Sequence, residues 1–155
     1  MTEPQRAAAR LKVDILMRDE WIAEGYLRAV RRFIGAEERG GEPNAVGMSL
    51  SISLLEAGTW LAILDDRVKL GNDADVRAMR FIRDRTHHQA ASAIRLEHET
   101  SQWLWQHSAF LPRPTEDRHA KDRDVPAYER LQGRPVREVL ERLAVRVEEI
   151  RRGAA

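Results

Sequence analysis

The residues of this chain best suited to chemistry lie together in the stretch 81–89, Phe-Ile-Arg-Asp-Arg-Thr-His-His-Gln. Histidine titrates near neutral pH and can therefore act as a general acid or base. Arginine binds phosphate and stabilises the extra negative charge of a phosphorane-like transition state. Arg83 with His87 or His88 would thus suffice for RNA transesterification without a metal ion. Asp84 lies one helical turn before His88, so its carboxylate could orient that imidazole.

The spacing of these residues limits how a single chain can use them. On a straight helix of 3.6 residues per turn, Arg83 and His88 point about 140° away from each other. His87, four residues after Arg83, shares the face of Arg83 better. Two arrangements follow. Either His87 is the working histidine, or two copies of the chain meet beside a two-fold axis and each supplies part of the site.

The pattern Arg83-Asp84-x-x-x-His88 resembles the signature of the HEPN superfamily, which is an arginine, a polar residue and a histidine after four to six intervening residues. The resemblance implies an all-helical bundle that dimerises. It also implies a metal-independent endoribonuclease of toxin–antitoxin or phage-defence type, whose site forms in a cleft at the dimer interface. Arg83 and His88 carry over as catalytic residues, and Asp84 as the polar neighbour. Arg80 with His87 fits a looser form of the spacing, so the register stays open.

Four apolar stripes with helical periodicity predict the elements that position this stretch. The predicted helices cover residues 10–34, 45–68, 74–107 and 135–152. Asp73 is a good N-cap for the third helix, and Pro135 suits the start of the last one. We expect residues 1–8 to be frayed, Gly35 to end the first helix, and residues 108–125 to form an exposed loop. No alternating segment of strand length is evident.

The predicted fold is therefore a single all-α domain over residues 1–155, a four- to five-helix up-down bundle of HEPN type. The apolar stripe of the first helix is predicted to include Leu11, Ile15, Ile22, Tyr26, Val30 and Phe33. Core or interface packing is the expected role of Trp21 and Tyr26, and core packing that of Trp103 and Trp105. The last helix could bury its stripe in the bundle or present it to a partner such as an antitoxin.

Composition excludes several classes of protein. The chain has 155 residues, 43% hydrophobic and 33% charged, with a net charge of +1, which argues against duplex DNA as a partner. It has no cysteine, so disulfides, thiolate catalysis and cysteine-ligated zinc are excluded. No signal peptide and no apolar run of membrane-spanning length are evident. We expect a soluble, cytoplasmic homodimer without a cofactor or a metal, and with RNA as its substrate.

Three other interpretations compete with that of an endoribonuclease. In the first, Arg83, Asp84 and His87 or His88 form a polar seam that specifies a dimer in a non-catalytic interaction module. In the second, a metal site uses His87 and His98, but these lie three turns apart on one helix. In the third, the protein binds DNA, but no compact helix-turn-helix is evident and the net charge is near neutral. Separately, Glu56 could face the arginine–histidine stretch, although pairing with some arginine is the simpler expectation for this carboxylate.

Overall fold

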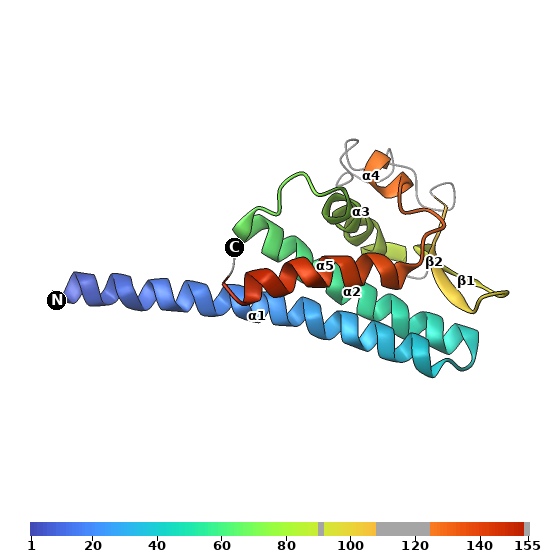
Figure 1. The fold of residues 1–155 in the computed structure, drawn as a ribbon, viewed down its shortest axis with the longest axis horizontal. Helices are drawn as coiled ribbons and strands as arrows, with labels where there is room; N and C mark the ends of the chain where they lie inside the picture. The colour runs from blue at the N-terminus through green and yellow to red at the C-terminus, as the bar shows by residue number, and fades with distance from the viewer. Residues whose placement is uncertain (90–91, 108–124, 154–155) are drawn as a thin grey trace.

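The computed structural model describes residues 1–89, 92–107 and 125–153, without the side chains of residues 12–17 and 84–89. This part of the chain is mostly helical, which confirms the predicted all-α class (Figure 1). Its helices are α1 (Glu3–Arg39), α2 (Pro43–Val68), α3 (Ala74–Gln89), α4 (Val125–Glu129) and α5 (Val136–Arg151). A small antiparallel hairpin, β1 (Ile94–Glu97) and β2 (Gln102–Trp105), lies between α3 and α4. The predicted loop 108–125 falls almost entirely outside the described residues.

α1 is longer at both ends than predicted. Thr2 and Gln5 form a capping box, in which each side chain accepts a hydrogen bond from the backbone N–H of the other residue. Residues 3–8 are therefore helical and not frayed. The helix also continues through Gly35 to Arg39, and it ends at Gly40, whose φ of 62° suits a residue without a side chain.

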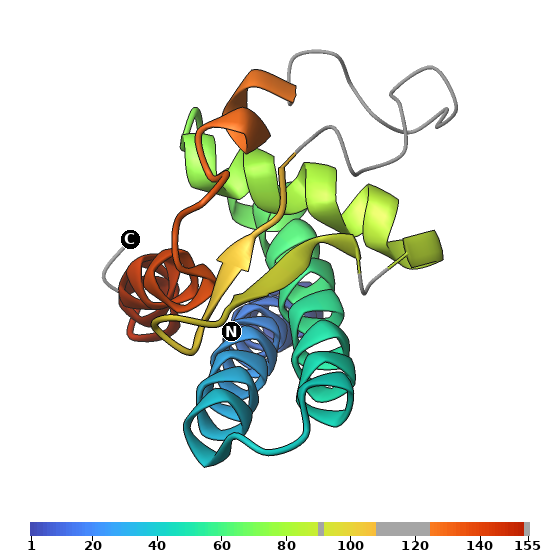
Figure 2. The same ribbon diagram turned by 90° about the vertical axis from the view of Figure 1, so that its right-hand side faces the viewer.

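α1 and α2 form an antiparallel hairpin, and α5 packs on α1 (Figures 1 and 2). α3 lies across these three helices instead of alongside them, which departs from the simple up-down arrangement that we expected. The N-terminal part of α1 projects beyond the rest of the molecule (Figure 1). Leu11 and Trp21 are therefore 60% and 61% exposed, so neither packs in the core. Packing of Trp21 at an interface stays a prediction.

The prediction of one helix over residues 74–107 is also wrong. α3 ends at Gln89, and β1 pairs with β2 in the register Ile94↔Trp105 to Glu97↔Gln102. Each strand has only four residues, too few for an alternating pattern to stand out in the sequence. The hairpin is tied to the segment before α5, because Trp105 N–H donates to the carbonyl of Arg134 and Gly133 N–H donates to that of Trp105.

The core lies between α1, α2, α3 and α5. Tyr26 is fully buried, and its hydroxyl donates to the carbonyl of Leu140 over 2.9 Å, which joins α1 to α5. Phe81 of α3 stacks on Tyr128 of α4 with ring centroids 5.1 Å apart. The apolar stripe of α5 is buried in the bundle. Of the two roles predicted for this helix, the structure therefore shows core packing and not presentation to a partner. The buried members of this stripe are Val136, Val139, Leu140, Leu143 and Val147.

By length and composition, α2 is apolar enough to cross a membrane, whereas the sequence suggested no run of that kind. Half of its most apolar window is buried inside the molecule. One helix of this kind is weak evidence for a membrane span, because core helices pass the same test.

Candidate functional site

The candidate residues Arg83, Asp84, His87 and His88 all lie in the C-terminal half of α3. Asp73 caps this helix as predicted, because its carboxylate accepts hydrogen bonds from the backbone N–H groups of Asp75 and Val76. The backbone is helical through all four candidate residues. The side chains of Asp84, His87 and His88 lie outside the described residues, so contacts among the four stay predictions.

Arg83 lies where α3 crosses α2. A Cβ atom added to Gly58 of α2 would lie 3.3 Å from the Cβ of Arg83 and 3.8 Å from the carbonyl oxygen of Met79. The two helix backbones approach closely here because Gly58 has no side chain. Arg83 is half-buried, so the crossing fixes the start of its side chain. No local pattern in the sequence predicts that Gly58 sets this position.

Arg80, the other arginine that fits the motif, is held by two carboxylates at the C-terminal end of α2. Its Nη1 donates to Asp65 over 2.8 Å and to Asp66 over 2.7 Å. Burial alone would lower the pKa of the Arg80 guanidinium, but the hydrogen bonds to Asp66 and Asp65 outweigh burial and raise it. Arg80 therefore serves to fasten α3 to α2.

Glu56 and His98, which the sequence offered as possible partners of the arginine–histidine stretch, lie outside α3. Glu56 pairs with Arg32 of α1, as the simpler expectation had it. His98 lies in the turn between β1 and β2, so it does not share a helix with His87, and the geometry assumed for a two-histidine metal site is wrong. Among the described side chains, no group of three or more His, Asp and Glu residues is arranged to hold a metal ion.

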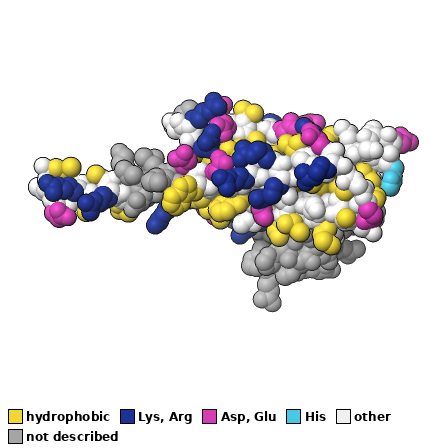
Figure 3. All heavy atoms as spheres, turned by 90° about the horizontal axis from the view of Figure 1, so that it is seen from below, with side chains coloured by type: hydrophobic (Ala, Val, Ile, Leu, Met, Phe, Trp, Pro, Cys, Tyr) yellow, Lys and Arg dark blue, Asp and Glu magenta, His cyan; other side chains and the backbone are white. Residues whose placement is uncertain are grey.

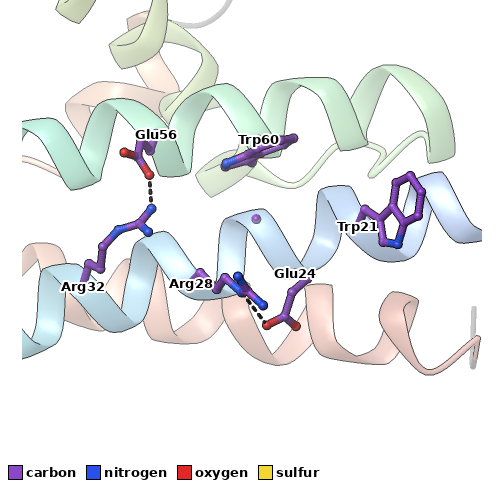
Figure 4. A pocket seen from close by; sticks show the side chains of 7 residues that line it. Trp21, Glu24, Arg28, Arg32, Glu56 and Trp60 are labelled. Atoms are coloured by element: carbon purple, nitrogen blue, oxygen red, sulfur yellow. Dashed lines mark hydrogen bonds and ion pairs between the residues drawn. The ribbon is translucent and has the colours of Figure 1, made fainter.

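A hollow of about 380 Å³ lies on the outside of the α1–α2 hairpin (Figure 4). Its lining residues come from the two helices, and they are Trp21, Glu24, Gly25, Arg28, Arg32, Glu56 and Trp60. The sequence did not single out this surface. One periodic sign was present, since Trp21, Gly25, Arg28 and Arg32 are spaced three or four residues apart.

The charges that line this hollow are largely compensated. Glu24 accepts hydrogen bonds from Arg28 over 3.2 Å and from Arg31 over 2.9 Å. The hydrogen bond from Arg28 is the main reason why the pKa of the Glu24 carboxyl is lowered. Arg32 is paired with Glu56 on the other wall (Figure 4). An anionic ligand would thus have to compete with carboxylates that are already in place.

The indole of Trp60 lies against the α1 backbone at Gly25. A Cβ atom on Gly25 would lie 2.5 Å from two ring carbons of Trp60, a distance that real structures do not show. We expect Gly25→Ala to lower the free energy of unfolding by about 1–3 kcal/mol, because the ring must move. Urea denaturation would measure this.

Gly35→Ala is the matched control in the same helix. Its new Cβ would meet only the flexible end of Arg39, and alanine favours a helix interior by about 0.5–1 kcal/mol over glycine. A gain in stability for both variants would contradict the packing of Trp60 on Gly25.

The remaining tryptophans pack as predicted. Trp105 is fully buried, and Trp103 lies against Gly47, where an added Cβ would come 3.0 Å from its ring. Burial raises the pKa of the nearby Glu37 carboxyl, although that carboxylate accepts a hydrogen bond from the backbone N–H of Trp103. The face with α1 in front mixes arginines, carboxylates and apolar side chains (Figure 3). That mixture is unlike the continuous basic surface of a duplex-DNA-binding protein.

Comparison with known proteins found no family model, no curated protein and no solved structure that matches this chain.

Proposed function

We propose that this protein is a HEPN-like, metal-independent endoribonuclease of toxin or phage-defence type that acts in the cytoplasm as a homodimer. The observation that carries the proposal is the placement of Arg83. It lies at the α2–α3 crossing, where its Cβ atom meets Gly58 of α2. The helix continues without interruption as far as Gln89, so Arg83 and His88 lie on one helix as the motif requires.

The proposed reaction is an internal transesterification of RNA. A neutral histidine accepts the proton of a 2′-hydroxyl, and the 2′-oxygen attacks the adjacent phosphorus. Arg83 stabilises the added negative charge on the phosphoryl oxygens. The bond to the 5′-oxygen then breaks, and that oxygen takes a proton from a histidine in the acid form. The products are a 2′,3′-cyclic phosphate and a 5′-hydroxyl.

Two copies of the chain supply what one copy cannot. Because Arg83 and His88 are five residues apart on one helix, they point about 140° away from each other. A site built beside a two-fold axis can combine Arg83 of one copy with His88 of the other. Asp84, one turn before His88, then serves to orient the imidazole.

The test is cleavage of a mixed RNA pool in EDTA by the wild type, His87→Ala and His88→Ala. We expect cleavage to persist in EDTA, to leave 2′,3′-cyclic phosphate ends, and to fall about 100-fold or more in His88→Ala. His98→Ala, an exposed histidine in the hairpin turn, is the matched control and should cleave normally. Loss of activity in His87→Ala alone would move the working histidine to that position. No cleavage by the wild type would reject the nuclease proposal.

A non-catalytic interaction module is the second candidate function. The observation that favours it is a set of exposed apolar side chains on α2, with Met48 at 67%, Ile52 at 55% and Ile63 at 37% exposure. If the wild type leaves RNA intact and the substitution His88→Ala weakens self-association, the arginine–histidine stretch is a seam between subunits.

A further inference from the structure

One face of α2 is apolar and uncovered over most of its length. Met48 and Ile52 are more than half exposed there, Ile63 is 37% exposed, and the half-buried Leu55 and Thr59 continue the row between them. We call these five residues the α2 stripe. Their spacing places them on one side of the helix, opposite the residues that face the core. From Met48 to Ile63 the stripe extends about 22 Å along the helix.

The α2 stripe is self-complementary in the antiparallel sense. Four of its five members are placed symmetrically about the point between residues 55 and 56, and the fifth, Leu55, would lie opposite Glu56 of the second copy. An antiparallel second copy would therefore set Met48 against the partner's Ile63, and Ile52 against the partner's Thr59. The same operation brings Glu42 opposite the partner's Lys69, and both of these charged residues are exposed. The two outer pairs of the stripe and this charged pair thus match in a single register, as an isologous interface requires, with Leu55 and Glu56 beside the axis.

We propose that the α2 stripe binds a second copy of this chain, with the two-fold axis beside residues 55 and 56. The position of α3 supports this choice of partner. The two-fold axis is perpendicular to the α2 pair, so it carries both copies of α3 to the same side of the interface. Figure 2 shows that the C-terminal end of α3 extends past α2 on the side away from α1 and α5.

The distances agree with direct packing of the two α3 helices. Arg83 contacts α2 at Gly58, which lies about 4 Å along the helix from the proposed axis. The two α3 helices would then pass about 7–8 Å apart, close to the 8–10 Å usual for packed helices. Segments 83–88 of the two copies would meet beside the axis. This last consequence rests on the proposed function, whereas the interface itself does not.

The area buried in the interface limits the affinity of the dimer. Specific stable interfaces usually bury about 1,200–2,000 Å² in total, and a single pair of helix stripes with the α3 ends lies at or below that range. We therefore expect a dimer whose formation depends on protein concentration. Sedimentation velocity over a concentration series measures this directly.

The first test compares Ile52→Glu with Val145→Glu. Both replace an exposed apolar residue, at 55% and 64% exposure, but Val145 lies on α5, away from the stripe. Ile52→Glu should shift the mass toward the 17.8 kDa of one chain, because the interface would then hold unpaired carboxylates. Val145→Glu should associate like the wild type. A wild type that stays monomeric, or equal effects of the two substitutions, would overturn the proposal.

The second test determines the register of the two α2 helices. The chain has no cysteine, so any disulfide must join introduced cysteines. A disulfide requires Cα atoms about 4.4–6.8 Å apart. On oxidation, a mixture of Ile52→Cys and Thr59→Cys should form a covalent dimer, whereas each variant alone should not. In the antiparallel register, identical residues at position 52 lie about 10 Å apart along the helix. Cross-linking of Ile52→Cys to itself, or none in the mixture, would overturn the antiparallel arrangement.

These measurements separate the interface from the nuclease. A cross-linked dimer that leaves RNA intact supports the interface and rejects the proposed function. Cleavage by the monomeric Ile52→Glu variant at the wild-type rate overturns the interface as part of the site. Capture of another macromolecule by a monomeric wild type assigns the α2 stripe to that partner instead.

Discussion

Arg83→Ala is expected to lower the rate of RNA cleavage by about 100- to 1,000-fold, the usual loss when one donor to a developing anionic charge is removed. The physical reason is the charge of the transition state, which a guanidinium stabilises through two hydrogen bonds to phosphoryl oxygens. Single-turnover cleavage at saturating enzyme measures the chemical step without the contribution of substrate binding.

The part of Arg83 that lies against Gly58 is its Cβ atom, and alanine retains that atom. Arg83→Lys separates charge from geometry, because lysine keeps the charge but lacks the planar fork. Arg130→Ala, an exposed arginine just beyond α4, is the matched control. Equal activities of Arg83→Ala and Arg130→Ala would contradict the role given to Arg83.

Asp73→Ala is expected to lower the free energy of unfolding by about 2–4 kcal/mol, the combined effect of a lost helix cap and lost charged hydrogen bonds. Asp73 caps α3 and also accepts hydrogen bonds from two arginines of α5, Arg142 over 2.6 Å and Arg146 over 2.7 Å. The residue thus ties the start of α3 to α5, although the two are far apart in sequence. Urea denaturation followed by circular dichroism measures the loss.

Asp73→Asn distinguishes the two contributions. Asparagine caps a helix about as well as aspartate, so this variant should keep the cap and lose only the charge. We expect Asp73→Asn to be more stable than Asp73→Ala by about 1 kcal/mol. Equal stability of the wild type and both variants would contradict the link between α3 and α5.

The pKa of the Asp73 carboxyl also makes the free energy of unfolding depend on pH. Burial alone would raise the pKa of Asp73, but the hydrogen bonds from Arg146 and Arg142 outweigh burial and lower it. The folded pKa is thus below the unfolded value, so the contribution is complete above about pH 4 and is lost as the pH falls through the folded pKa. The stability difference between the wild type and Asp73→Asn should shrink over that acidic range.

Much of the helical framework followed from local chemistry in the sequence. The α5 stripe from Val136 to Val147 predicted a buried helix, and Asp73 predicted the start of α3. Both signals act within one or two turns, so a reader of the sequence can see them. The capping box of Thr2 and Gln5 is equally local, but residues 1–8 carry too little apolar pattern to predict a helix by periodicity.

The hairpin shows where local pattern fails. Residues 94–105 carry enough apolar side chains to continue a helix, yet they pair as two strands. The deciding contacts are distant in sequence, namely the hydrogen bonds of Trp105 with Arg134 and Gly133 and the packing of Trp103 on Gly47. Tertiary contacts of this kind override the intrinsic preference of a short segment.

By itself, the sequence determined the helical class, the candidate residues Arg83, Asp84, His87 and His88, and the problem that Arg83 and His88 point apart on one helix. Only the tertiary structure decided that Arg80 is bound to Asp65 and Asp66, that Arg83 lies against Gly58, and that α3 crosses α2 beside an uncovered apolar stripe. The physical reason is that helix periodicity depends on residues only three or four positions apart in the sequence. The crossing of two helices, by contrast, is set by side chains and glycines that come together only when the chain has folded.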